Sequence, residues 1–222
     1  MNRRWAESMN DRDIRAALGA HLHWRVASDA LLVEELGLCQ GDVFVDVAVV
    51  DGAIEGYEIK SDRDTLRRLE RQLAAYSRVL SKATIVVGKK HLEAAKSLVP
   101  DWWGILLACA APSRVNLRHI RKPRNNPVVD PNSLVQLLWR DEVLQLLQMR
   151  QKATGLLSKP RRVLWERLIA ECSMGELQAT VCSQLKRRVE WRSGSQRIRR
   201  GDSYPPLPTS PDCQRHRTSS GN

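Results

Sequence analysis

The sequence has few of the features that mark several common protein classes. Aromatic residues make up only 5% of its 222 residues, and its five cysteines are scattered, with no C-x-x-C pair. This cysteine pattern argues against a disulfide framework or a zinc ribbon, and it fits a reduced cytoplasm. The longest apolar run, 102–111, is too short to span a bilayer, and no secretory signal pattern is visible. We expect a cytoplasmic protein with no membrane partner.

Several motifs that would identify a chemistry are also missing. The five histidines show neither H-x-x-x-H nor H-E-x-x-H spacing, which makes a histidine-based zinc site unexpected. The sequence has no glycine-rich phosphate loop, no Ser/His/Asp pattern and no internal repeat.

The hydrophobic pattern changes between helical and strand periods in a regular order. It predicts a helix at 11–21, strands near 31–38, 43–50 and 53–60, a helix at 64–80 with Asp64 as N-cap, a strand at 83–87, a helix near 91–98 and a strand near 104–109. This order predicts an α/β fold whose core is a helix, a three-strand meander, a helix and a strand.

Charge divides the chain into two unlike halves. Residues 1–110 hold 15 Lys/Arg and 16 Asp/Glu, whereas 111–222 hold 21 and 9, so the second half carries essentially all of the net charge of +11. A basic half of this kind suits binding to nucleic acid, because neutralising phosphates gives affinity that does not depend on sequence. The alternative for each basic cluster is a solvated helix end.

These patterns predict four segments. They are a core at 1–110, a basic linker at 111–132, a small basic helical subdomain at 133–193 and a disordered tail at 194–222 that is rich in Ser, Pro, Gly and Arg. The expected nucleic-acid contacts are Arg114, Arg118, Arg121 and Lys122 in a loop after the core, with Lys186, Arg187 and Arg188 at a helix end.

A carboxylate stands out in the second strand. Asp46 is the one charged residue of an apolar, β-branched run, and Glu58 and Lys60 lie two residues apart, on one face of the next strand. A two-residue loop would pair Asp46 with Tyr57 and put the carboxylates on opposite sides. We favour a loop of Val50, Asp51 and Gly52, with Gly52 left-handed, which puts Asp46 and Glu58 on one face.

Such a cluster could bind a hard divalent cation. Carboxylates bind Mg²⁺, which keeps several waters and accepts phosphate oxygens, and a nearby ammonium can stabilise the attacked phosphate. The alternative is a surface hairpin on which Glu58 and Lys60 form a solvated pair. Gln72 and Tyr76, at i and i+4 of the following helix, could hydrogen-bond to the site or to a nucleic-acid backbone, although Tyr76 could equally be a core residue.

The order of these residues resembles the PD-(D/E)XK nuclease superfamily. The resemblance covers about residues 11–110 and rests on Asp46, on Glu58-Ile59-Lys60, and on Gln72-x-x-x-Tyr76, which is similar to the element that follows the active site in RecB-type and phage-exonuclease-type members. The segments EELGL, GYEIKSDRDTL and P-x-W-W-G resemble small bacterial and phage members. Two departures are Val45, where a proline is usual, and Phe44, where a basic residue is frequent.

The resemblance implies a restriction-endonuclease-like core, Mg²⁺ or Mn²⁺ as cofactor, and DNA, or failing that RNA, as partner. It makes Asp46 and Glu58 metal ligands and Lys60 the catalytic lysine, with Gln72 and Tyr76 completing the site. An upstream acid would add a ligand, and we favour Glu35 over Glu34. Three functions stay open: a metal-dependent DNA nuclease, which we favour; a nuclease-fold protein without useful turnover that binds nucleic acid or regulates; and a module whose basic half docks an acidic protein.

Overall fold

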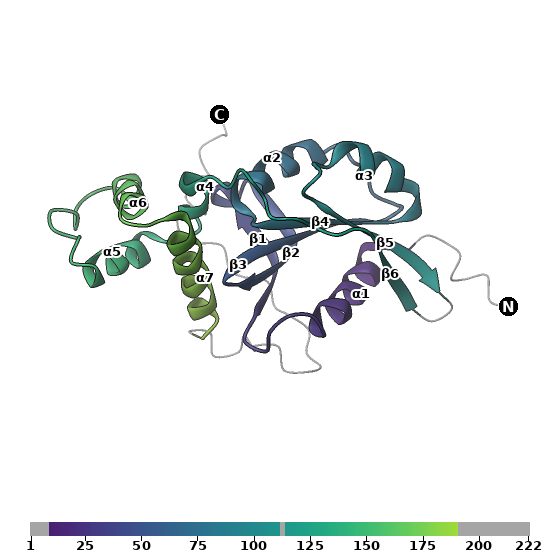
Figure 1. Ribbon diagram of the computed structural model, residues 1–222, viewed down its shortest axis with the longest axis horizontal. Coiled ribbons are helices and arrows are strands. Elements are labelled where there is room, and N and C mark those ends of the chain that lie inside the picture. Colours follow the sequence, from purple (N-terminus) through teal and green to yellow (C-terminus); the bar gives the residue numbers. More distant parts are fainter. Residues whose placement is uncertain (1–8, 112–113, 191–222) are drawn as a thin grey trace, which may run out of the picture.

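The computed structural model describes residues 9–111 and 114–190, and these residues form one six-stranded sheet (Figure 1). The strands lie in chain order. β3, β4 and β5 are parallel, and the remaining neighbours are antiparallel. The strand bounds are β1 Leu31–Leu38, β2 Val43–Asp51, β3 Ala53–Lys60, β4 Lys82–Val87, β5 Gly104–Ala111 and β6 Arg114–Arg121. The expected α/β class is confirmed.

Helices cover both faces of the sheet, and further helices lie beyond one end of it (Figure 1). α1 lies on one face, α2 and α3 lie on the other, and α7 packs against β2 and β3. The bounds are α1 Asp11–His23, η2 Cys39–Gly41, α2 Leu69–Val79, η3 Lys89–His91, α3 Leu92–Leu98, α4 Pro131–Val135, α5 Arg140–Met149, α6 Arg161–Ala170 and α7 Met174–Glu190. No helix in the described ranges is long and apolar enough to cross a membrane.

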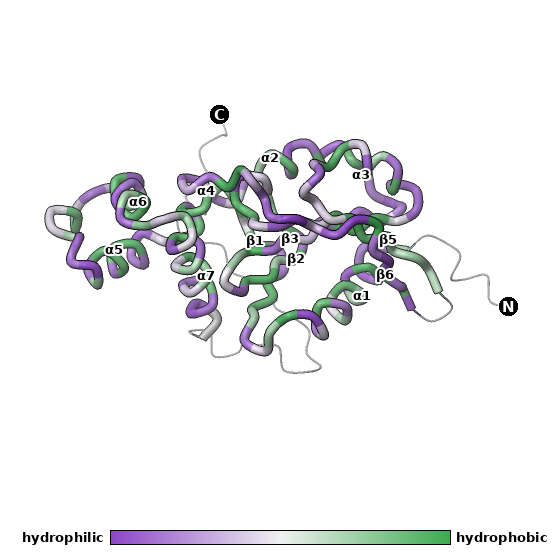
Figure 2. Tube along the Cα trace, viewed as in Figure 1, coloured by the Kyte–Doolittle hydropathy of each residue, from purple (hydrophilic) through white to green (hydrophobic). Residues whose placement is uncertain are grey.

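Two apolar clusters hold these layers together. On the α1 face, Ile14, Leu18 and Leu22 follow helical spacing and pack on the sheet. The cluster on the α2 face continues without a break into α4, α5, α6 and α7. Figure 2 shows apolar residues concentrated along the strands and recurring along the helices that cover them. The helices after residue 130 therefore share their core with the sheet.

The turn between β2 and β3 is tighter than expected. Asp51 pairs with Ala53 and Val50 with Ile54, which leaves Gly52 alone at the tip, with φ +67°. The left-handed glycine is confirmed, but the three-residue loop is wrong. The real pairing differs from the expected one by two residues, and an even shift leaves the paired residues 47–51 and 53–57 on their expected faces. Tyr57 pairs with Val47 and not with Asp46, so the alternative register is excluded.

The expected linker contains a strand. Arg114, Arg118 and Arg121 do not lie in a loop after the core, because 114–121 forms β6 and pairs antiparallel with β5. Val115 and Leu117 alternate with polar residues and pack towards α1. This two-residue period was masked by the high charge of the segment.

The helix expected from Asp64 begins later, at Leu69. The Asp64 carboxylate accepts hydrogen bonds from the Ser61 amide and hydroxyl, at 2.7 and 2.6 Å, so it caps a turn and not a helix. The expected disordered tail, 194–222, lies outside the described residues.

Candidate active site at the opening between β2 and β3

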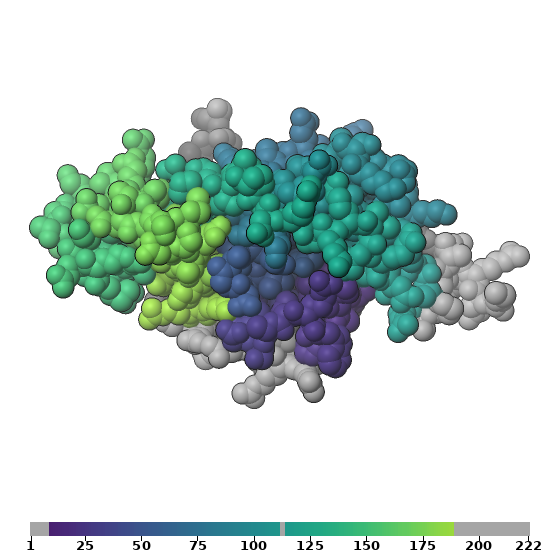
Figure 3. All heavy atoms as spheres, viewed as in Figure 1, coloured from purple at the N-terminus to yellow at the C-terminus, as the bar shows by residue number. Residues whose placement is uncertain are grey.

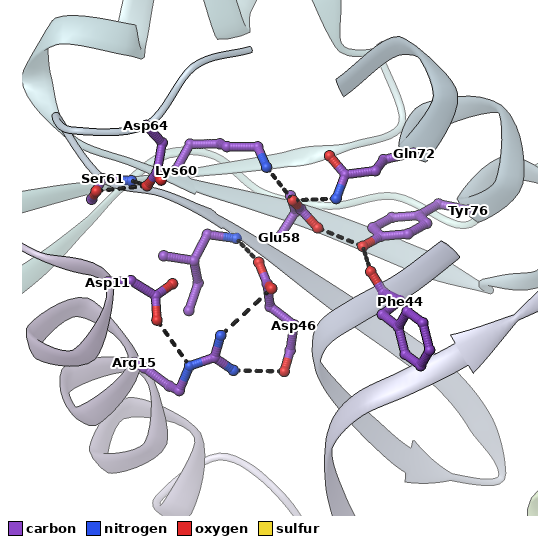
Figure 4. A network of polar contacts seen from close by, with 11 residues as sticks. Asp11, Arg15, Phe44, Asp46, Glu58, Lys60, Ser61, Asp64, Gln72 and Tyr76 are labelled. Atoms are coloured by element: carbon purple, nitrogen blue, oxygen red, sulfur yellow. Dashed lines mark hydrogen bonds and ion pairs between the residues drawn. The ribbon is translucent and has the colours of Figure 1, made fainter. Parts of the chain in front are cut away.

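Asp46 lies where β2 and β3 separate. Their paired ladder ends at Val47 and Tyr57, and beyond it the Asp46 carboxylate accepts the hydrogen bond of the Ile59 amide at 2.7 Å (Figure 4). The Asp46 carboxylate thus takes the place of the backbone carbonyl that would accept this hydrogen bond if the β2–β3 ladder continued. On its other side, Arg15 of α1 donates to the Asp46 backbone oxygen at 2.8 Å and lies 3.5 Å from Oδ1.

An irregularity in β1 and β2 explains this position. Val43 and Val45 face α2, and so do Ala48 and Val50, so the alternation of side chains changes step between them. The β1 partner opposite Asp46 is Glu35, which is left out of the pairing and has φ +53°. Both strands change step at the same place. The apolar clusters on the two faces of the sheet continue on both sides of this irregularity. The Asp46 carboxylate enters the gap between β2 and β3.

Glu58 is the centre of a buried polar cluster on the α2 face (Figure 4). Lys60 Nζ lies 2.5 Å from Glu58 Oε1, and Gln72 Nε2 donates to the same oxygen at 2.6 Å. The Tyr76 hydroxyl lies 2.5 Å from Oε2 and 2.8 Å from the Phe44 carbonyl. Glu58 is 1% exposed and Lys60 7%, so the alternative of a solvated surface pair is wrong.

Burial and like charge perturb this cluster. Burial, followed by the charge of Glu58, raises the pKa of Asp46 from 3.8 to about 7, although the Ile59 amide, Arg15 and Lys60 act in the opposite direction. Burial and Glu58 also raise the pKa of Tyr76, so its hydroxyl stays a donor. The two carboxylates therefore repel each other in a poorly solvated place, and an added cation would relieve this repulsion.

The residues present fit a hard divalent cation of the Mg²⁺ type. Asp46 and Glu58 supply carboxylate oxygens, and Mg²⁺ commonly takes one or two carboxylates and keeps several waters. The Gln72 carbonyl oxygen is buried without a hydrogen-bond partner, next to Glu58. Within the described residues, no group of three or more His, Cys, Asp or Glu side chains forms a metal cluster.

The upstream acids differ in their placement. Glu35 is exposed and forms no ion pair within the described part of the chain, so the structure does not bring it to Asp46 and Glu58. Glu34 is half-buried, and its charge contributes to the raised pKa of Arg15. Within the described residues, neither acid hydrogen-bonds to or forms an ion pair with Asp46 or Glu58, and Glu34 is the one whose charge acts on Arg15.

Arg15 was not anticipated from the sequence. It also pairs with Asp11, at 3.2 Å, and thereby links α1 to Asp46. A signal was present, because Asp11, Arg15, Leu18 and Leu22 follow one another at helical spacing on the side of α1 that meets the sheet.

The expected nucleic-acid contacts fall into two groups. Arg121 donates to the Trp103 and Pro100 carbonyls, and Lys186 pairs with Asp29 and Asp51. Arg188 pairs with Glu142 and lies over the Trp139 ring. These three are committed to internal contacts, whereas four are exposed: Arg114, Arg118, Lys122 and Arg187.

The fold and site define an α/β protein with a mixed six-stranded sheet and a buried carboxylate–lysine cluster at the opening between two strands. The chain belongs to the family described as Bacteriophage P4 protein cII, which matches residues 5–202. Protein cII of Enterobacteria phage P4 is 26% identical over 184 residues, which cover 82% of this chain and 69% of that protein. No solved structure matches. The expected bacterial or phage character agrees with a family named after a phage protein.

Proposed function

We propose that this protein is a metal-dependent nuclease that hydrolyses phosphodiester bonds in DNA. One observation carries the proposal: the Asp46 carboxylate, the Glu58 carboxylate and the Lys60 ammonium converge where β2 and β3 separate, and two further side chains are committed to Glu58. Burying charged side chains is costly unless they are paired. Carboxylates whose pKa is shifted in this way are concentrated at functional sites.

Each residue has a role that follows from its contacts. Asp46 and Glu58 would hold Mg²⁺ or Mn²⁺, which when bound lowers the pKa of a coordinated water and offsets charge on the attacked phosphate. Lys60 supplies positive charge beside the reacting phosphate. Gln72 and Tyr76 are positioning residues, because their donors fix both oxygens of Glu58. Arg15 holds Asp46 in the same way.

The substrate class rests on the exposed cations. Arg114, Arg118, Lys122 and Arg187 can contact phosphates, and this contact does not distinguish DNA from RNA, so DNA is the favoured substrate and RNA the alternative. A nuclease of this kind would act in the cytoplasm of the host cell.

The test is cleavage by the full chain. Linear, circular and single-stranded DNA are incubated with Mg²⁺, with Mn²⁺ and with EDTA. We expect cleavage only with a cation, and loss of cleavage in Asp46→Asn and Glu58→Gln. Glu93→Gln is the matched control, because Glu93 is an exposed carboxylate on α3 that pairs with Lys96 and lies outside the cluster. Cleavage by both site variants at the wild-type rate would overturn the proposal.

A protein that keeps this cluster without turnover is the second candidate. It is favoured by the hydrogen bonds at Glu58 Oε1, which the Lys60 ammonium and the Gln72 amide already satisfy. Such a protein would bind DNA equally well in EDTA and in Mg²⁺ and would leave it intact.

A further inference from the structure

A second polar site lies on the α1 side of the sheet, away from Asp46. It is a pocket of about 270 Å³ between the end of α1, strands β3 to β5 and the end of β6. In Figure 3 the blue atoms of the middle strands are visible between α1 in purple and the teal segment that includes β6. The polar lining residues that carry the argument are His21, Arg25, Tyr57, Lys82, His119 and Lys122. His21 lies six residues after Arg15, roughly 9 Å further along the helix axis.

Arg25 holds two histidines at the pocket. Its Nη1 lies 2.9 Å from Nε2 of His119 and 3.4 Å from Nε2 of His21. A guanidinium only donates, so both Nε2 atoms accept and both rings are neutral. Burial, followed by Arg25, lowers the pKa of each histidine, and Lys122 lowers that of His119 further.

The pocket has an excess of positive charge. Lys82 pairs with Glu55 at 2.9 Å, whereas neither Arg25 nor Lys122 is paired with a carboxylate in residues 9–111 and 114–190. Leu22, Leu106 and Pro123 line the remaining wall. Apolar walls lower the local dielectric constant, and this strengthens the attraction between such cations and an anion.

We propose that this pocket binds a phosphate group, either inorganic phosphate or a small phosphate monoester. A dianion matches the two unpaired cations, and a guanidinium and an ammonium are the donors that phosphates favour. The two imidazoles add donors when they take up protons. The volume lies just below the usual range for ligand pockets, which begins at about 300 Å³, so the pocket suits a small ligand. The proposal does not depend on the nuclease function.

Affinity in this pocket should increase as pH falls. The groups that face a bound anion are His21, His119, Arg25, Lys122, Lys82, Glu55 and Tyr57. Burial raises the pKa of Tyr57 to about 12, so its hydroxyl does not titrate near neutral pH. Between pH 8 and pH 6 the change comes from His21 and His119, because an anion favours their charged forms.

The test is calorimetric titration of the full chain, free of divalent metal, with inorganic phosphate, with AMP and with sulfate. We expect Arg25→Gln and Lys122→Gln each to weaken phosphate binding about tenfold or more, since each removes a charged hydrogen bond. Arg162→Gln, an exposed arginine on α6 outside the pocket, should bind as wild type does. AMP distinguishes the sources, because a monoester site binds it at least as tightly as inorganic phosphate.

Sulfate separates the titration of the protein from that of the ligand, because its charge is constant between pH 6 and pH 8. Sulfate should bind more tightly at pH 6, and the imidazole nitrogen signals of His21 and His119 should shift on binding. No binding by wild type at millimolar phosphate, or equal affinity in Arg25→Gln, Lys122→Gln and wild type, would overturn the proposal. Arg25 and Lys122 are exposed, so their variants should fold.

Discussion

Asp46 links proton binding to stability at the scale of a single residue. Its pKa is 3.8 in ordinary surroundings and about 7 in the folded chain, so between these values the folded state holds more protons than the unfolded state. The free energy of unfolding that Asp46 contributes therefore falls as pH rises from about 4 to about 7. In the absence of a cation, the site is a source of instability at neutral pH.

Replacing Asp46 with Asn should relieve this instability. We expect Asp46→Asn to match wild type near pH 4 and to exceed its free energy of unfolding by about 1–4 kcal/mol at pH 8, since one pKa unit corresponds to about 1.4 kcal/mol and partial exposure reduces the effect. Urea denaturation at both pH values measures it. Asp101→Asn, at an exposed carboxylate, is the control and should show no such dependence. A smaller advantage at pH 8 than at pH 4 would contradict the assignment.

Lys60 and Glu58 should have opposite effects on cation binding. The Lys60 ammonium lies on Glu58 Oε1 and opposes a second positive charge there. We expect Lys60→Met to bind Mn²⁺ at least as tightly as wild type but to lose cleavage, and Glu58→Gln to lose both. Calorimetric titration with Mn²⁺ decides. If folded Lys60→Met binds Mn²⁺ as poorly as Glu58→Gln, Lys60 organises the site and does not act on the phosphate.

The positions of the candidate site residues could be predicted from the sequence to different degrees. Asp46, Glu58 and Lys60 were identifiable because a charge in a β-branched strand and a two-residue spacing both constrain the side chain locally. Glu34 and Glu35 were not distinguishable, because the left-handed backbone at Glu35 depends on the partner strand. Arg15 approaches Asp46 across 31 residues of sequence, a contact that only the folded chain defines.

At the scale of elements, β6 tests whether alternation outweighs charge. Leu117 is half-buried against the α1 cluster, while the adjacent Arg118 is exposed. We expect Leu117→Ser to lower the free energy of unfolding by about 1–2 kcal/mol, since it removes apolar burial. Arg118→Ser should change stability little. Equal effects of the two substitutions in urea denaturation would show that β6 does not pack as described.

Elements were predicted well where one local signal dominated. β1 and β3 have the expected bounds, 31–38 and 53–60, because the strand pattern and the Asp51-Gly52 turn mark them locally. α2 begins five residues after Asp64, because Asp64 accepts from Ser61 and turn chemistry competes with helix capping. The pairing of β6 with β5 depends on the tertiary structure, and the high charge of residues 114–121 obscured their strand pattern.

At the scale of the whole molecule, internal pairing limits how many cations could meet DNA in the proposed function. Arg121, Lys186 and Arg188 are committed to internal contacts, which leaves Arg114, Arg118, Lys122 and Arg187 of the seven expected contacts. Four phosphate contacts predict a slope of log K against log salt of roughly −3.6, against roughly −6 for seven.

The salt dependence of DNA binding measures this number directly. We expect Arg187→Gln to reduce the magnitude of the slope by about 1 with little change in stability. Arg188→Gln should instead destabilise the fold, because it leaves the half-buried Glu142 carboxylate without its ion-pair partner. A slope near −6 in wild type would mean that the internally paired cations also reach phosphates.

The shared core could not be predicted from composition. The change in charge near residue 110 suggested a boundary, yet the buried cluster on the α2 face runs through Leu134, Leu147, Leu168 and Leu185. Packing between segments so far apart in sequence has no local signature. The division of charge along the chain therefore describes its surface and not its core.

β6 is the last strand of the sheet, and within the described ranges its outer edge pairs with no other strand. An open edge invites a second chain to add to it, and charged side chains together with an irregular register discourage such pairing. Arg114 and Arg118 lie along β6, and its register shifts beside Ile105 and Leu106. The same arginines that could bind a polyanion thus discourage self-association of the chain through this edge. Neutralising them would leave an open edge that favours aggregation.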